Sequence, residues 1–149
     1  MNIWTVYSDG GCAPSNPGPC AWGAVCEPPA PAVPFEGAGF IGHGTNQIAE
    51  LVAATEGLKM TPEGAAVQLV SDSQYVLRGI SEWRAGWERR GWRNSRGEPV
   101  ANAERWRALF QLVDAREVSV RWVRGHNGHP QNERCDQLAA AALAARTRG

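Results

Sequence analysis

The sequence has no excess of charge of either sign, because its 15 lysines and arginines equal its 15 aspartates and glutamates. It also has no run of the roughly 18 apolar residues that a membrane-spanning helix requires. Its first residues, MNIWTVYSDGG, lack the basic start, apolar stretch and cleavage site of a signal peptide. These absences argue against membrane and secreted proteins, and they predict a cytoplasmic protein.

None of the four cysteines, Cys12, Cys20, Cys26 and Cys135, stands in a CxxC pair. This spacing is not that of a zinc site or of a dithiol redox motif. An even number of cysteines leaves disulfides open, but without a secretion signal we expect four reduced thiols.

What is present suffices for one globular domain covering residues 1–149, since 43% of the residues are hydrophobic and neither a repeat nor a linker interrupts them. The charge is unevenly distributed. The stretch WRAGWERRGWRNSRG, residues 83–97, holds five arginines, one glutamate and three of the seven tryptophans. A local basic surface on an otherwise balanced protein indicates a surface directed at a partner.

Hydrophobic patterns predict alternating strands and helices. β-Branched and aromatic residues predict strands at 2–9, 21–27, 37–44, 65–72 and 117–125, with a glycine- and proline-rich loop at 10–19. Helical spacing predicts helices at 45–60, from 73 to a bend or end at Gly79, at 102–115 and at 132–149, with a short helix in the basic segment. The resulting order, β-β-β-α-β-α-α-α-β-α, predicts an α/β fold with a mixed sheet flanked by helices.

Four carboxylates stand where this fold would gather them. Asp9 and Asp72 each end a predicted strand, and Glu50 and Asp136 lie one turn into predicted helices. Such a cluster is tolerable when cations neutralise it, and oxygen ligands suit Mg²⁺ or Mn²⁺. Two such ions about 4 Å apart form a clamp for phosphoryl displacement.

Each of these acids also has an ordinary interpretation. Asp72 could cap the helix that begins at Ser73, and Asp9 could be a turn residue before glycine. Glu50 and Asp136 could be surface acids of helices. Spacing alone does not choose between these interpretations and a shared metal site.

Four motifs in order, YSDGGCAPSNPGP, TNQIAEL, VSDSQYV and VRGHNGHPQNERCDQLA, resemble type I ribonucleases H of the bacterial form. WERRGWR with PVANAERW resembles the basic handle of that form, at about residues 83–101. The resemblance implies a ribonuclease H-like α/β fold, whose five-stranded mixed sheet has three antiparallel strands, then two parallel ones. It implies a monomer that hydrolyses the RNA strand of RNA–DNA hybrids by two-metal-ion catalysis. The cofactor would be Mg²⁺, or Mn²⁺ in its place, and the products would carry 3′-hydroxyl and 5′-phosphate ends.

The resemblance assigns the catalytic metal ligands to Asp9, Glu50, Asp72 and Asp136. It assigns the mobile-loop histidine, which would help protons or product leave, to His126. The substrate-binding positions that it implies are Gly10, Gly11, Cys12, Asn16, Thr45, Asn46, Gln47, Gln74, Trp83, Arg89, Arg90 and Asn102.

These positions divide by the strand they would contact. The DGGC backbone, Asn16, Asn46, Gln47 and Gln74 match positions that contact the minor groove or the sugars. Asn16, Thr45 and Asn102 match the pocket for a DNA phosphate, and Trp83 matches an aromatic residue of the channel for that strand. Arg84, Arg89, Arg90, Arg93 and Arg96 of the handle would hold phosphates, whereas Trp87 and Trp92 would pack the handle together. His43 and His129 are expected to be structural or exposed.

The chain departs from the family pattern in places. NQIAE stands where NNRME is usual, so that Gln47 and Ile48 replace an asparagine and an arginine, and the first loop has one extra residue near Pro14.

Three alternatives remain. The first is another nuclease or strand transferase of the same fold, such as an integrase or a junction resolvase, against which the GHNGHP loop and the handle argue. The second is a hybrid-binding module without catalysis, against which the four acids and His126 argue. The third is a fragment of a reverse transcriptase. A domain that starts at Met1 and ends shortly after its last helix favours a free-standing protein instead.

Overall fold

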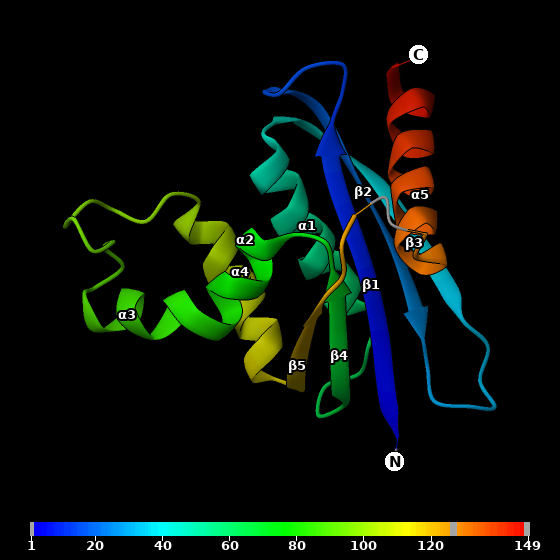
Figure 1. The fold of residues 1–149 in the computed structure, drawn as a ribbon, viewed down its shortest axis with the longest axis horizontal. Helices are drawn as coiled ribbons and strands as arrows, with labels where there is room; N and C mark the ends of the chain where they lie inside the picture. The colour runs from blue at the N-terminus through cyan, green and yellow to red at the C-terminus, as the bar shows by residue number, and fades with distance from the viewer. Residues whose placement is uncertain (1, 126–127, 148–149) are drawn as a thin grey trace.

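A five-stranded sheet with the strand order β3-β2-β1-β4-β5 forms the centre of the computed structural model, which describes residues 2–125 and 128–147 (Figure 1). Its strands are β1 (Ile3–Cys12), β2 (Gly18–Glu27), β3 (Phe35–Gly44), β4 (Ala66–Ser71) and β5 (Glu117–Trp122). β1, β2 and β3 pair antiparallel, whereas β4 runs parallel to β1 and β5 parallel to β4. The predicted mixed sheet is confirmed.

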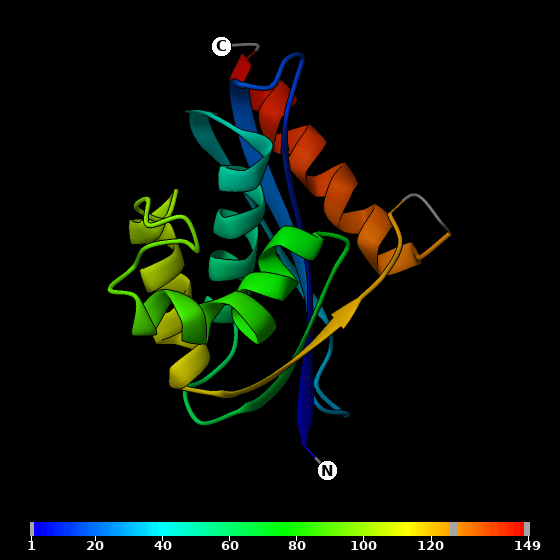
Figure 2. The same ribbon diagram turned by 60° about the vertical axis from the view of Figure 1, so that its left-hand side comes forward.

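Helices cover both faces of this sheet (Figure 2). They are α1 (Asn46–Lys59), α2 (Gln74–Arg78), the π-helical turn η1 (Gly79–Trp83), α3 (Arg84–Arg89), α4 (Ala103–Asp114) and α5 (Pro130–Thr147). α1 packs on β1 and β2 with α4 beside it, and α5 packs on β1, β2 and β3 from the other face. The predicted order of elements is confirmed, and the helix after β4 continues through η1 at Gly79. None of the described helices has both the length and the apolar character needed to span a bilayer.

The core has two parts, one on each face of the sheet. The larger part lies under α1 and α4 and is built on fully buried side chains that include Val6, Leu51, Leu69, Trp106 and Leu109. The smaller part lies under α5 and contains Tyr7, Val25, Val70, Val123 and Cys135. Burial on both faces fixes the register of the central strands, because a slip of one residue would exchange the two sets.

The first hairpin is longer than the sequence indicates. The predicted loop 10–19 is wrong at both ends, because β1 continues to Cys12 and pairs with β2 from Cys20. Asp9 therefore lies inside β1, opposite Gly23, rather than at the strand's end. The neighbouring strand β4 ends at Ser71, opposite Ser8, so that β1 has no partner on that side from Asp9 onward.

The longer hairpin also explains an error about the cysteines. Cys12 and Cys20 face each other in register with their Cα atoms 4.0 Å apart, and a disulfide joins them. The prediction of reduced thiols is wrong for this pair, because placing both residues in a loop concealed their cross-strand pairing. Cys26 and Cys135 are free and buried, as expected.

Candidate active site

Two glycines let helices on opposite faces approach the middle of β1 and β2. A Cβ atom on Gly10 would lie 2.1 Å from the main-chain oxygen of Ala49, so the main chain of α1 lies directly against β1 there. A Cβ atom on Gly23 would lie 2.3 Å from the main-chain oxygen of Cys135, so α5 approaches β2 equally closely. The residues that follow these contacts are Glu50 and Asp136, and both are thereby brought to Asp9.

Asp72 reaches the same place from β4. It directly follows Ser71, whose strand runs parallel to β1 and ends level with Ser8. Trp122 Nε1 donates a hydrogen bond to the main-chain oxygen of Asp72 at 3.2 Å. The interpretation of Asp72 as a helix cap is wrong, because the N-cap of α2 is Ser73.

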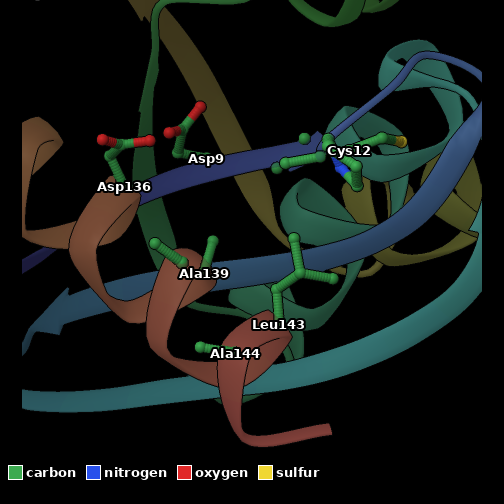
Figure 3. A pocket seen from close by; sticks show the side chains of 11 residues that line it. Asp9, Cys12, Asp136, Ala139, Leu143 and Ala144 are labelled. Carbon is green, nitrogen blue, oxygen red and sulfur yellow. The ribbon is translucent and has the colours of Figure 1, made fainter. Parts of the chain in front are cut away.

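The four acids act on one another electrostatically. Burial, followed by the negative charges of Asp72 and Asp136, raises the pKa of Asp9 to about 8, and a hydrogen bond with Asp136 and the charge of Glu50 add to this. Burial also raises the pKa of Glu50, with a contribution from Asp72, whereas a hydrogen bond from Ser73 opposes the shift. Figure 3 shows the carboxylates of Asp9 and Asp136 side by side. The structure thus brings together all four acids that the sequence singled out.

This donor set suits a hard divalent cation. All its ligand atoms are carboxylate oxygens, and burial together with the charges of the other acids raises the pKa of Asp9, which is the effect that a bound cation would offset. Within residues 2–125 and 128–147, no three potential ligands already stand in the geometry of a formed ion site. The residues fit the ion in charge and in ligand type, and their side chains would have to adjust to bind it.

The raised pKa of Asp9 has a consequence for stability without metal. Between the unfolded value of 3.8 and the native value of about 8, the native protein holds a proton that the unfolded chain has lost. This contribution to the free energy of unfolding is therefore complete below pH 4 and is lost as the pH rises towards 8. At about 1.4 kcal/mol per pKa unit, the loss amounts to several kcal/mol.

We expect urea unfolding in EDTA to show that the stability difference between wild type and Asp9→Asn changes with pH. Asp9→Asn has no carboxyl group to titrate at this position. Its free energy of unfolding should therefore increase relative to that of wild type as the pH rises from 5 to 8. A difference that stays constant over this range would contradict the assignment.

Five of the predicted substrate-binding positions lie at or beside the N-terminus of α1. The main-chain N–H of Asn46 donates to Asn16 Oδ1 at 3.0 Å, and Asn46 Oδ1 accepts from the main-chain N–H of Cys12 at 2.9 Å. Thr45 caps the helix, its hydroxyl accepting from Ile48 N at 3.2 Å. Gln47 is exposed on the first turn. These bonds fasten the β1–β2 loop to α1, next to the disulfide.

Two further predicted residues, Asn102 and Trp83, lie beside Tyr75. The sequence analysis did not single out Tyr75. Asn102 Nδ2 and Trp106 Nε1 both donate to the Tyr75 hydroxyl oxygen, at 3.2 and 3.0 Å. The ring of Trp83 lies 6.1 Å from the ring of Tyr75. Gln74, the residue before Tyr75, is exposed on the first turn of α2. The only sequence signal for Tyr75 was its place in the VSDSQYV motif.

Comparison with known proteins agrees with this geometry. The RNase H family model matches residues 1–144. The chain belongs to the ribonuclease H family. A ribonuclease H from Granulibacter bethesdensis is 45% identical over 141 residues, which cover 95% of this chain and 92% of the relative.

Solved structures of ribonucleases H share the fold. LC9-RNase H1, described as a type 1 RNase H with the type 2 active-site motif, superposes with a TM-score of 0.85 at 28% identity, over 97% of this chain and 74% of that one. LC11-RNase H1, solved in complex with an RNA/DNA hybrid, has a TM-score of 0.72 at 21% identity, over 97% of this chain and 99% of that one. The chain is thus a member of a nuclease family that in general depends on divalent metal ions.

The segment predicted to be the basic handle projects from the sheet as α3 and the loop that follows it (Figure 1). Trp87 is buried against Trp106 and Trp92, with ring centroids 5.1 and 6.0 Å apart, and Trp92 packs on Phe110 at 5.8 Å. The prediction that Trp87 and Trp92 pack the handle together is confirmed.

The handle arginines divide into two groups. Both terminal nitrogens of Arg84 bond Asp114 at 2.6 Å, which compensates its charge and argues against the phosphate role predicted for it. Arg90 and Arg93 donate to main-chain oxygens and keep their charge. Arg89 is exposed and has no ion pair within the described part of the chain.

The sequence contains three histidines, with different predicted roles. His126, the predicted mobile-loop histidine, lies outside the described residues. His129 Nδ1 accepts from the main-chain N–H of Asn132 at 3.3 Å at the start of α5, and His43 is exposed. The structural or exposed roles predicted for His129 and His43 are confirmed.

Proposed function

We propose that this chain is an endoribonuclease that hydrolyses the RNA strand of RNA–DNA hybrids and leaves 3′-hydroxyl and 5′-phosphate ends. The observation that carries the proposal is the convergence of Asp9, Glu50, Asp72 and Asp136. Burial and then the charges of the other three acids raise the pKa of Asp9 to about 8. Membership of the ribonuclease H family and the hybrid bound by its fold neighbour LC11-RNase H1 support the proposal. We further propose that residues 1–149 form one catalytic domain that acts as a cytoplasmic monomer.

The four carboxylates would hold two divalent ions, Mg²⁺ or Mn²⁺ in its place. Ions bound there supply a lowered pKa for an attacking water and positive charge at the departing oxygen. The main chain at Gly10, Gly11 and Cys12 borders the acids and leaves room for the scissile strand. His126 would help protons or product leave.

Other residues would distinguish the two strands. Asn16, Asn46, Gln47 and Gln74 offer amides in the β1–β2 loop and in the first turns of α1 and α2. Amides can both donate to and accept from the 2′-hydroxyls and base edges of a minor groove. Asn16, Thr45 and Asn102 would hold a phosphate of the DNA strand, and Trp83 would line its channel. Phosphate contacts of this kind fix the register of the duplex without reading its sequence.

The deciding experiment is incubation with end-labelled RNA–DNA hybrid, duplex RNA and duplex DNA, each with and without Mg²⁺. We expect cleavage of the RNA in the hybrid alone, and only with the metal. Cleavage of duplex DNA would instead favour an integrase- or resolvase-like nuclease. Binding of the hybrid without cleavage would favour a module that lacks catalysis.

We expect the handle to bind phosphates through Arg89 and Arg90. Replacing both by alanine should weaken hybrid binding and reduce the slope of log K against log salt concentration by about two, because roughly one counterion is released per phosphate contact. Fluorescence anisotropy across a salt series measures this slope. The matched control is Lys59→Ala with Arg146→Ala, which removes the same charge from the last turns of α1 and α5. Equal slopes for the two double variants would remove the handle from the interface.

A further inference from the structure

The hydroxyl of Ser73 joins the start of α2 to Glu50. Ser73 is 6% exposed, and its Oγ lies 3.2 Å from the main-chain nitrogen of Val76 and 2.6 Å from Glu50 Oε2. A hydroxyl has one proton to donate. Because the N–H of Val76 already points at Oγ, that proton goes to the carboxylate, and the direction of both hydrogen bonds is settled.

Ser73 is itself held firmly on the segment that carries Asp72. Its main-chain N–H donates to Ser71 Oγ at 3.0 Å, and Ser71 is buried at the end of β4. The preceding peptide is fixed from β5, because Trp122 donates to the main-chain oxygen of Asp72. The hydroxyl therefore ties an acid of α1 to a rigid junction between β4 and α2.

This link affects what Glu50 can do. A glutamate side chain is long and flexible, and ordering such a chain costs up to about 2 kcal/mol of rotamer entropy. The short bond fixes Oε2 and leaves Oε1 available.

We propose that Ser73 is a positioning residue, which holds Glu50 in one orientation so that Oε1 can bind a divalent cation. This inference rests on the metal site of the proposed function. Groups that orient metal ligands through hydrogen bonds typically change metal affinity or activity by about 10- to 100-fold when they are removed.

Three variants separate the donor from the helix cap. Ser73→Thr keeps both roles, and Ser73→Ala loses both. Ser73→Gly loses the donor but keeps most of the cap, because glycine is tolerated at N-caps at a cost of a few tenths of a kcal/mol. Ser81→Ala is the control, since Ser81 lies further along the same helical segment and its hydroxyl donates to the main-chain oxygen of Leu77 rather than to Glu50.

The first measurement is Mg²⁺ binding to the protein without substrate, by isothermal titration calorimetry. We expect the dissociation constant to rise about 10- to 100-fold in Ser73→Ala and Ser73→Gly, and to stay near wild type in Ser73→Thr and Ser81→Ala. In a Glu50→Gln background, Ser73→Ala should have no further effect, because the serine acts through that acid. Wild-type Mg²⁺ affinity in folded Ser73→Gly would overturn the inference.

The second measurement is cleavage of the hybrid as a function of Mg²⁺ concentration. In Ser73→Ala and Ser73→Gly we expect kcat to fall with little change in KM for the hybrid. The Mg²⁺ concentration that gives half-maximal cleavage should rise. Weakened Mg²⁺ binding in a protein whose wild type cleaves no hybrid would sink the proposed function and leave this inference standing. Normal cleavage by both wild type and Ser73→Gly would support the proposed function and overturn the role of Ser73. A wild type that neither binds Mg²⁺ nor cleaves the hybrid would overturn the proposed function and the role of Ser73 together.

Discussion

Asp9→Asn should reduce hybrid cleavage by about a thousandfold while metal-free binding of the hybrid persists. The charges of the other three acids all raise the pKa of Asp9, so Asp9 lies within reach of each of them. Asparagine has nearly the same shape as aspartate but lacks the negative charge that would hold the ions. Several kcal/mol of transition-state stabilisation by metal ions correspond to a rate factor of this size. Metal-free binding at pH 8 should be equal or tighter, because Asp9 is partly ionised there and the variant removes that negative charge from the surface that faces the phosphates.

Single-turnover cleavage with Mg²⁺ and anisotropy in EDTA measure the two effects separately. Glu63→Gln is the control, since it neutralises an exposed acid in the turn between α1 and β4. In EDTA at pH 8 the melting temperature of Asp9→Asn should exceed that of wild type, because carboxylate repulsion is relieved. Normal turnover by the variant would remove Asp9 from the site, and a lower melting temperature would contradict the repulsion.

Gly10→Ala should destabilise the protein by about 3 kcal/mol or more. The added methyl group would lie 2.1 Å from the main-chain oxygen and 2.5 Å from the carbonyl carbon of Ala49, which are backbone atoms that cannot rotate away. Overpacking typically costs about 1–3 kcal/mol, and a clash between backbone and a rigid methyl belongs at the upper end. Because α1 must move, Glu50 moves with it, so cleavage should fall in whatever fraction remains folded.

Gly11→Ala provides the comparison, because it changes the next residue of the same strand. Its methyl group would meet only Asn46 Oδ1, at an ordinary distance of 3.7 Å. Urea unfolding should place this variant within about 1 kcal/mol of wild type. If both alanines had the same effect, the close approach of α1 at Gly10 would not limit the fold.

Local hydrophobic and propensity patterns predicted the order of strands and helices correctly. They did not predict where the first hairpin turns. Glycines 10 and 11 favoured a loop, whereas the structure uses Gly10 inside a strand to admit a helix. The same reading separated Cys12 from Cys20 and so missed their disulfide. Glycine frequency does not distinguish a turn from a close helix–strand contact, because both need a residue without a side chain.

The four acids were found because motif order identifies them, not because spacing along the chain does. Their neighbours could not be found in this way. Ser73 resembled an ordinary helix-starting serine, and nothing in the sequence shows that its proton reaches Glu50, 23 residues away. Arg84 shared the composition of the handle, yet its partner Asp114 lies 30 residues further along the chain. Such pairs depend on tertiary packing, which local patterns do not contain.

The bond between Cys12 and Cys20 means that this polypeptide exists in two covalent states, selected by the thiol reagents in its surroundings. In the oxidised state, a small closed ring presents Asn16 to the main chain of α1. Dithiothreitol opens that ring without touching the carboxylates. Preparations that differ only in reductant therefore differ in the loop that is fastened to α1, so ligand affinities measured on them should be compared only at the same reductant concentration.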